Sequence, residues 1–279
     1  METPFEKPPT EQPEANQHEQ IKLPTRVLPL EERDVTVDDY TLSTFKTLEE
    51  RARYSKVLDR KRFWNMLVST VERTGYKPLQ ERPATVLDLG CGKCEEGIVL
   101  NAFFGGGNFG SSSENVKLIG VDIKQKDIER AINSYSSPDF SGKITKYVLP
   151  PNYEFIVGDA TNLDQYQQIP GEVDVVVIRH EQISDNEVVW TKIFGQALQR
   201  VSKEGIIIIT SFSDVEHKTL IEALQKLDCE IVINERNPYA KQLSHPKVSL
   251  DRNITIIRKK NFPPNRAKLG VPPRAERKT

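Results

Sequence analysis

The chain has 279 residues, and its 39 Lys and Arg residues nearly balance its 40 Asp and Glu residues. A near-neutral charge gives no electrostatic argument for binding of the whole chain to nucleic acid or a membrane surface. The length allows one large domain or two small ones, and three cysteines do not make a disulfide framework. No apolar run approaches the roughly 20 residues of a membrane span, so we expect a soluble cytoplasmic protein.

The two ends of the chain differ in composition from its middle. Residues 1–34 are rich in Pro, Glu and Gln and poor in large apolar residues, which predicts a disordered N-terminal arm. Residues 35–258 form the predicted folded domain. Residues 259–279 carry seven basic residues, four prolines and one acid. This composition predicts a solvated, disordered tail whose charge suits nucleic acid or an acidic partner.

Apolar residues recur at helical spacing before the first predicted strand. Between Leu42 and Val71 they are mostly three and four residues apart. We therefore predict two amphipathic helices, at about 43–58 and 60–74, the second ending at Gly75. These helices could pack on one face of a sheet or cover a ligand site, and the sequence leaves both alternatives open.

The stretch 85–97, TVLDLGCGKCEEG, combines an apolar run with a glycine turn. The run is typical of a parallel strand that is buried on both faces. Gly90 and Gly92 allow a sharp turn and a close approach of a ligand to the backbone. A helix predicted to begin near Cys94 would point free N–H groups at the same space. Such a turn after a first strand is where open α/β sheets bind nucleotides.

The spacing of this motif excludes two common nucleotide sites. A dinucleotide fingerprint needs a third glycine where this chain has Glu95, and the Gly-Lys-Ser/Thr of a P-loop is absent. What remains is Asp88-x-Gly90-x-Gly92, whose carboxylate suits a cationic ligand group. In this motif the chain resembles the class I S-adenosylmethionine-dependent methyltransferases. The resemblance covers residues 85–258 and departs at Cys94, where the family usually has a glycine.

Short apolar runs alternate with helical patterns along the rest of the chain, which predicts βαβ units. The predicted strands are 116–121, 153–157, 174–178, 206–210, 230–234 and 253–258. One helix is predicted to begin near Gln125, others cover 188–201 and 214–227, a Gly/Ser-rich insertion covers 105–113 and a turn covers 203–205. No helical pattern separates the last two strands. We therefore expect a seven-stranded, mostly parallel α/β sheet with helices on both faces and an antiparallel last strand.

An acidic residue follows two of these predicted strands. Asp122 lies where a ribose-binding acid is expected, although the interval from Gly92 exceeds the usual spacing of about 20 residues because of the Gly/Ser-rich insertion. The resemblance implies that Asp122 holds the ribose of S-adenosylmethionine. It also implies that Asp159 meets the adenine amino group, with Ala160 against the ring. Each acid could instead cap a helix or a turn.

The fourth strand delivers Arg179, His180 and Glu181 to the same sheet edge, where the resemblance places the transferred methyl group. His180 could accept a proton from the acceptor, and Glu181 could position His180 or take that proton itself. Alternatively, both residues cap the next helix and line the pocket. Methyl transfer can also proceed by alignment alone, without a base. The Asn/Asp-Pro-Pro-Tyr/Phe motif of amino-directed family members is absent.

The sequence therefore predicts an S-adenosyl-L-methionine-dependent methyltransferase with an unidentified acceptor, a small molecule being slightly favoured. The resemblance implies cofactor contacts for Asp88, Gly90, Cys91, Gly92, Asp122, Ile123, Asp159, Ala160 and Arg179. The Cys91-x-x-Cys94 pair has no second pair to complete a metal site, so we expect no metal. Two alternatives stay open: a non-catalytic interaction protein that keeps the fold, and aminopropyl transfer from a decarboxylated cofactor.

Overall fold

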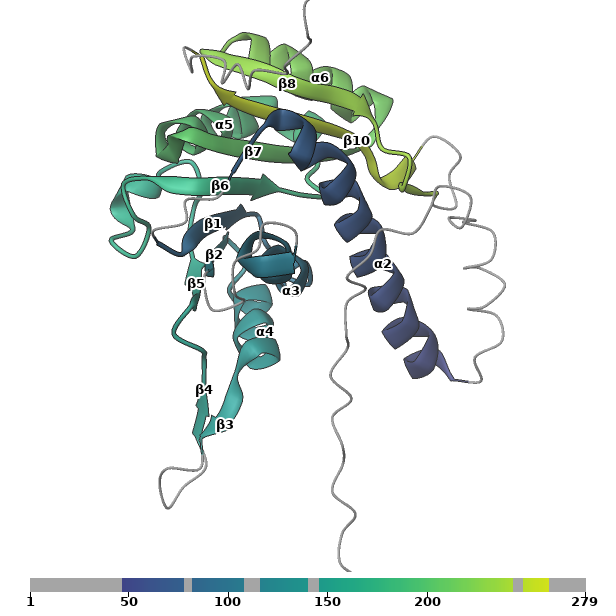
Figure 1. Ribbon diagram of the computed structural model, residues 1–279, viewed down its shortest axis with the longest axis vertical. Helices are drawn as coiled ribbons and strands as arrows, with labels where there is room; N and C mark the ends of the chain where they lie inside the picture. Colours follow the sequence, from purple (N-terminus) through teal and green to yellow (C-terminus); the bar gives the residue numbers. More distant parts are fainter. Residues whose placement is uncertain (1–46, 78–81, 108–115, 140–145, 243–247, 261–279) are drawn as a thin grey trace, which may run out of the picture.

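The computed structural model describes residues 47–77, 82–107, 116–139, 146–242 and 248–260. The predictions for the arm at 1–34, for most of the insertion at 105–113 and for nearly all of the basic tail lie outside these residues. One large sheet runs through the described chain, in the order β5-β2-β1-β6-β7-β10-β8 (Figure 1). Strand β10 is antiparallel to both of its neighbours, β7 and β8. The short strand β9 pairs with the first residues of β10. The predicted seven-stranded sheet with an antiparallel last strand is confirmed.

The observed strands contain the predicted apolar runs and extend several of them. They are β1 (Ala84–Leu89), β2 (Val116–Asp122), β5 (Tyr153–Val157), β6 (Val173–Ile178), β7 (Val201–Ser213), β8 (Cys229–Arg236), β9 (Lys241–Gln242) and β10 (Val248–Lys259). A separate hairpin of β3 (Ser137–Asp139) and β4 (Lys146–Val148) was not predicted. Each of its strands has three residues, which is too few for a period-two pattern to be recognised.

The helices divide between the two faces of the sheet. They are α2 (Leu48–Val71), α3 (Gly97–Ala102), α4 (Gln125–Tyr135), α5 (Glu187–Arg200) and α6 (Asp214–Gln225). Successive strand residues point to opposite faces, so Val86 packs in the cluster with α2, α3 and α4, whereas Leu87 packs with α5 and α6. Burial on both faces explains why the central strands are apolar without interruption.

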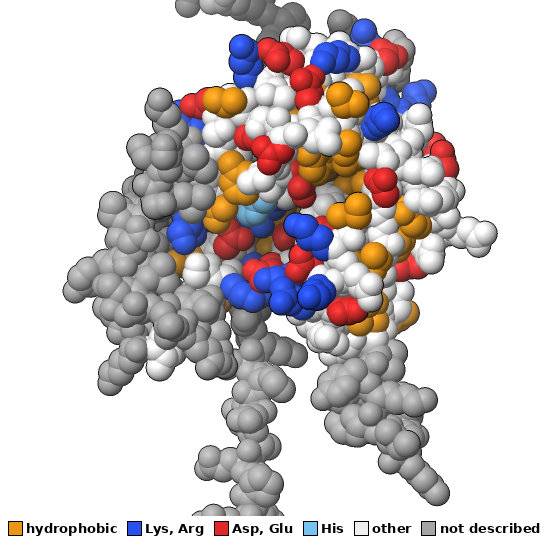
Figure 2. All heavy atoms as spheres, turned by 180° about the vertical axis from the view of Figure 1, so that it is seen from behind, with side chains coloured by type: hydrophobic (Ala, Val, Ile, Leu, Met, Phe, Trp, Pro, Cys, Tyr) orange, Lys and Arg blue, Asp and Glu red, His pale blue; other side chains and the backbone are white. Residues whose placement is uncertain are grey.

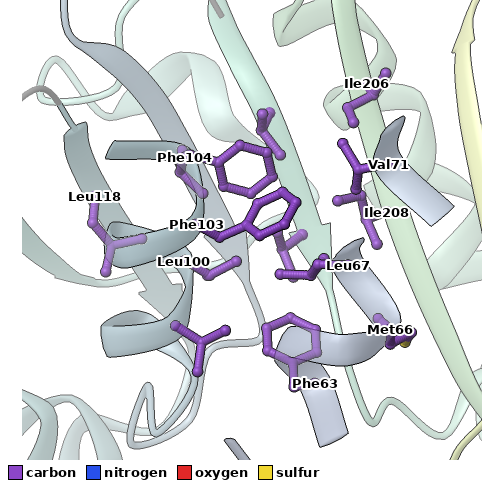
Figure 3. Close-up of a cluster of buried hydrophobic side chains, with 14 of the residues drawn as sticks. Phe63, Met66, Leu67, Val71, Leu100, Phe103, Phe104, Leu118, Ile206 and Ile208 are labelled. Carbon is purple, nitrogen blue, oxygen red and sulfur yellow. The ribbon is translucent and has the colours of Figure 1, made fainter. Parts of the chain in front are cut away.

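Helix α2 is fixed to its face of the sheet by fully buried side chains (Figure 3). Phe63, Leu67 and Val71 lie in one cluster with Phe103 and with residues of β6 and β7. Burial of each such side chain stabilises the fold by about 1.5–3 kcal/mol. The part of α2 that precedes this buried segment reaches the carboxyl edge of the sheet. Among the described residues, no helix is long and apolar enough to cross a membrane.

Two predicted helix boundaries were wrong. The helices predicted at 43–58 and 60–74 are one continuous helix, α2, followed by a 3-10 turn at Glu72–Thr74. No glycine or proline interrupts the chain before Gly75, whose φ of 72° ends the helix as predicted. Helix α3 begins at Gly97 rather than near Cys94, because the segment between them forms tight turns.

The turn predicted at 203–205 was also wrong, because these residues belong to β7. Pairing with β6 shifts register between Val173 and Val175, so the three residues form an irregular part of the strand. Gly205 permits this close packing, since a Cβ there would lie 2.5 Å from the backbone oxygen of Asp174. The sequence at 203–205 correctly indicated a break in the regular pairing of β7 with β6. It did not indicate that the strand continues through this break.

Candidate cofactor and acceptor site

A cavity of about 860 Å³ lies where the carboxyl ends of β1, β2, β5 and β6 meet. Figure 2 shows this face hollowed, with acidic side chains in the hollow and Lys and Arg side chains along one edge. Ten of the eleven predicted site residues line the cavity: Gly90, Cys91, Gly92, Asp122, Ile123, Asp159, Ala160, Arg179, His180 and Glu181. The eleventh, Asp88, is fully buried.

The glycine loop after β1 is tied to the end of β2 by its backbone. The N–H groups of Gly90 and Cys91 both donate to the carbonyl oxygen of Val121, at 2.8 and 3.2 Å. Gly90 and Gly92 have φ values of 72° and 53°, which glycine adopts readily. A Cβ at Gly92 would meet no atom within 4 Å, so this part of the backbone faces open space. The loop therefore leaves room for a ligand, as the sequence predicted.

Asp122 joins the glycine loop to the start of α4. Its Oδ2 accepts the Gly92 N–H at 2.8 Å, and its Oδ1 accepts the Lys124 N–H at 2.7 Å. Each carboxylate oxygen can accept two hydrogen bonds, so both retain capacity for a ligand hydroxyl. Asp159 makes a smaller turn, in which its Oδ1 accepts the Thr161 N–H at 2.8 Å. Asp159 thus makes the turn that the alternative expected, whereas Asp122 does not cap α4, and both acids line the cavity.

Asp88 lies beneath the loop, on the α3 side of the sheet. Its Oδ2 is 3.5 Å from the Cys94 sulfur, whereas its Oδ1 has no hydrogen-bond partner among the described residues. Burial, reinforced by the nearby Glu96, raises the pKa of Asp88 well above its usual range, which favours the protonated carboxyl. Cys94 has a φ of 51°, so this position has the backbone conformation that glycine favours.

The two cysteines of the loop are not activated thiols. A hydrogen bond to Cys91 and burial both hold the pKa of Cys94 well above its usual range. The hydrogen bond to Cys94 lowers the pKa of Cys91, but burial and the nearby carboxylates outweigh it and raise the pKa to about 11. Both side chains are therefore protonated at neutral pH, unlike the thiolates at many helix starts.

Arg179 is the centre of a buried ion-pair network. Its Nε lies 3.0 Å from Asp251 Oδ1, and its Nη2 lies 2.6 Å from Asp251 Oδ2 and 3.0 Å from Asp59 Oδ2. The guanidinium also lies over the Phe63 ring, 4.3 Å from its centroid, and its Nη1 is 4.0 Å from Glu96. With its side chain 3% exposed, Arg179 has most of its donors committed to protein carboxylates.

His180 and Glu181 point to different parts of the cavity. His180 Nε2 is 3.0 Å from Asp251 Oδ1, within ion-pair distance although outside hydrogen-bond angles, and its ring stacks on Phe212. Burial would raise the pKa of Asp251, but the charge of Arg179 holds it far below its usual range. The carboxylate of Glu181 instead lies against Gly90, where an added Cβ would collide with its Oε1.

Several cavity residues were missed by sequence reasoning. Asp59 on α2 lines the cavity and contacts the predicted Arg179. Asp251 on β10 also contacts Arg179 but does not line the cavity, and both acids are far from Arg179 in the chain. Helix α5 adds an apolar wall of Val189, Trp190 and Ile193. Their spacing marked these three only as the apolar side of a helix, because periodicity does not distinguish a core contact from a cavity wall.

Comparisons with known proteins assign the family. A sequence family described as "Methyltransferase domain" matches residues 80–261, more than half of the chain. The chain therefore belongs to this family, and it is a class I S-adenosylmethionine-dependent methyltransferase. A search of curated proteins found no match.

Solved structures with a similar fold include three methyltransferases. An S-adenosylmethionine-dependent methyltransferase from Clostridium acetobutylicum has a TM-score of 0.49 and 12% identity, covering 72% of this chain and 92% of that one. A methyltransferase from Methanosarcina mazei has a TM-score of 0.45 and 16% identity, covering 65% of this chain and 94% of that one. A TehB-like methyltransferase from Corynebacterium glutamicum has a TM-score of 0.41 and 16% identity, covering 64% of this chain and 82% of that one. At these identities the likeness concerns the fold alone.

The cavity suits S-adenosyl-L-methionine, the cofactor of this family. The cofactor carries a cationic sulfonium and a cationic amino group, and acidic residues outnumber basic ones along the cavity. The acids are Asp59, Glu95, Glu96, Asp122, Asp127, Asp159 and Glu181, and the bases are Lys56, Lys93, Lys124 and Arg179. The open backbone at Gly92 and the remaining hydrogen-bond capacity of Asp122 add room and acceptors for a ligand.

Proposed function

We propose that this enzyme methylates a small molecule that binds between α2 and the ends of β6 and β10. The observation that carries the proposal is that one cavity joins the glycine loop and Asp122 on one side to His180 on the other. Residues of α2 and Leu250 of β10 also line it, so an acceptor there would face the cofactor site. Bound S-adenosyl-L-methionine supplies an activated methyl group to a nucleophile aligned with it.

On the cofactor side, we assign the open loop at 90–92 to the methionine part of S-adenosyl-L-methionine. Asp122 would accept hydrogen bonds from both ribose hydroxyls with its remaining lone pairs. Ile123 and Ala160 would contact the adenine ring, and Asp159 would accept a hydrogen bond from its amino group. Asp88 is buried beneath the loop, so it would not touch the cofactor. It would act indirectly, by supporting the loop through its contact with Cys94.

On the acceptor side, we assign His180 as the group that removes the acceptor's proton. Asp251 beside Nε2 favours the tautomer with a proton on that atom, which leaves Nδ1 to accept the second proton. Such a base typically contributes about 10²- to 10⁴-fold to the rate. Arg179 would act as a positioning residue, since Asp251 and Asp59 occupy its donors.

Calorimetric titration with S-adenosyl-L-methionine tests the cofactor side. We expect Asp122→Ala to weaken binding about 100-fold, because two hydrogen bonds to a carboxylate are lost. Asp185→Asn is the matched control, since Asp185 is an exposed acid that does not line the cavity. Equal affinity of Asp122→Ala and the unchanged protein would remove the ribose assignment.

Incubation with methyl-labelled cofactor and fractionated cell extract tests the acceptor side. Label should enter the low-molecular-mass fraction. Label found only in protein or RNA would refute a small-molecule acceptor. Cofactor binding without a labelled product in any fraction would favour a non-catalytic interaction protein.

A further inference from the structure

A second, smaller cavity of about 280 Å³ adjoins the first and lies between α2, α3 and α4. Four basic side chains line it: Lys56 and Arg60 from α2, Lys93 from the glycine loop, and Arg130 from α4. Lys56, Lys93 and Glu95 line both cavities, so the two spaces meet. We call this second cavity the basic side pocket. The gathering of Lys and Arg side chains beside the hollow is visible in Figure 2.

The positive charge of the basic side pocket is only partly neutralised by the protein. Glu95, the one acid that lines it within the described chain, pairs with Lys56 at 2.9 Å. Arg130 pairs with Asp127 at 3.3 Å, on the rim of the larger cavity. Lys93 is exposed and Arg60 is half-buried, and neither has an ion pair among the described residues. Within the described part of the chain, these two cations therefore have no ion-pair partner.

Arg60 is held in place by the fold. It is half-buried, and its Nε donates a hydrogen bond to the Glu95 carbonyl oxygen at 3.3 Å. This bond leaves the Nη1 and Nη2 groups of the guanidinium available for a ligand. Two parallel N–H groups of one guanidinium match the geometry of a phosphate or carboxylate. Ser134 and Tyr135 also line the pocket, and their hydroxyls already donate to the Arg130 and Cys94 carbonyl oxygens, at 2.8 and 2.6 Å.

The two adjoining cavities therefore have opposite charge preferences. The larger is lined mostly by acids and suits the cationic cofactor, whereas the basic side pocket suits an anion. We propose that the basic side pocket binds a phosphate group, and that the acceptor is a small phosphorylated metabolite. This inference rests on the proposed function. It specifies the chemical class of the acceptor whose other end faces His180.

Charge and shape together favour a phosphate monoester over a nucleic acid. A monoester carries about −1.5 to −2 charges at neutral pH, which matches two unneutralised cations better than one carboxylate does. Nucleic-acid sites neutralise successive phosphates along a surface. Here the cations instead converge on one small pocket between three helices.

Titration of the full chain with inorganic phosphate, followed by NMR, tests the pocket. Phosphate should bind the protein in the absence and in the presence of saturating S-adenosyl-L-methionine. Arg60→Gln and Lys93→Gln should each weaken phosphate binding roughly three- to tenfold. Lys192→Gln, which changes an exposed lysine on α5, should leave binding unchanged. Because Lys93 is exposed, its substitution should not affect folding, so the test holds even if Arg60→Gln is unstable.

A second arm asks whether the acceptor itself carries the phosphate. Alkaline phosphatase treatment of the low-molecular-mass extract fraction, followed by removal of the phosphatase, should abolish its labelling by methyl-labelled cofactor. Heat-inactivated phosphatase should leave the labelling intact. Persistent labelling after active treatment would overturn the inference while leaving the proposed methyl transfer standing.

The remaining outcomes are equally decisive. Competition between phosphate and S-adenosyl-L-methionine would show that the pocket holds the cofactor's own carboxylate, and would overturn the inference. An RNA oligonucleotide that binds when inorganic phosphate does not would overturn it in favour of nucleic acid. Failure of S-adenosyl-L-methionine to bind would refute the proposed function. Phosphate binding is also measured without cofactor, so a failure of the proposed function can be distinguished from a failure of the phosphate pocket.

Discussion

The two sides of the large cavity are held together in different ways. On the cofactor side, backbone N–H groups of the glycine loop bind the end of the neighbouring strand, at Val121 and Asp122. On the acceptor side, Arg179 binds carboxylates from α2 and β10, which are 120 and 72 residues away in the chain. The first side therefore depends on main-chain geometry and one carboxylate, that of Asp122, whereas the second depends on buried charges that neutralise one another.

This difference teaches which side is vulnerable to a single substitution. A backbone hydrogen bond survives most side-chain changes, whereas a buried ion pair does not survive the loss of one partner. The network around Arg179 also joins three separate elements, so its loss should loosen α2 and β10 together.

Asp251→Asn should destabilise the protein by about 3–5 kcal/mol, because it leaves the buried Arg179 charge without its closest partner. The free energy of unfolding, measured by urea denaturation, checks this. Asp214→Asn is the matched control, since Asp214 pairs with Arg252 but its side chain is 63% exposed. We expect the control to cost less than about 1 kcal/mol. Equal losses in the two variants would contradict the contrast between the two sides.

Glu181→Gln should remove a pH dependence of stability. Burial, with a smaller effect from the charge of Asp122, raises the pKa of Glu181 from 4.5 to about 8. Folding therefore takes up a proton between these values, and stability is lost as the pH rises through this window. From pH 5 to pH 9 the unchanged protein should lose about 2 kcal/mol more unfolding free energy than the variant, allowing for partial exposure.

Denaturation curves at both pH values measure this loss, with Glu222→Gln, an exposed glutamate on α6, as control. The control should follow the unchanged protein. If the pH profile of Glu181→Gln matched those of the unchanged protein and of Glu222→Gln, Glu181 would be ionised in the folded state at neutral pH.

Gly90→Ala and Gly75→Ala should separate backbone strain from obstruction of the cofactor site. Both glycines have a φ of 72°, so each alanine should cost about 1 kcal/mol in unfolding free energy. A Cβ at Gly90 would also push the Glu181 carboxylate aside, whereas one at Gly75 would meet no atom within 4 Å. Calorimetry should show about tenfold weaker cofactor binding for Gly90→Ala only. Loss of binding in both variants would indicate a general effect of destabilisation.

The predicted sheet was right because its determinants are local. Uninterrupted apolar runs marked strands buried on both faces, and Gly90, Gly92 and Asp122 followed such runs. Parallel neighbouring strands end at one edge, so residues that follow them meet without further information. The family resemblance then assigned them roles, and the structure brought all but Asp88 to one cavity. Helix boundaries were less accurate, because turns at 93–96 and the absence of a break near residue 59 leave weak local signals.

By itself, the sequence determined the seven strands, their mostly parallel direction and the glycine loop, because apolar runs and turn residues are properties of short stretches of chain. The order of the strands came from the structure. Only the tertiary structure decided that Asp251 and Asp59 meet Arg179, that Glu181 turns to Gly90, and that the basic residues of α2 and α4 converge on one pocket. The physical reason is that ion pairs and cavities depend on distance in space. The local sequence pattern does not indicate which side chains, remote in the chain, will lie close together.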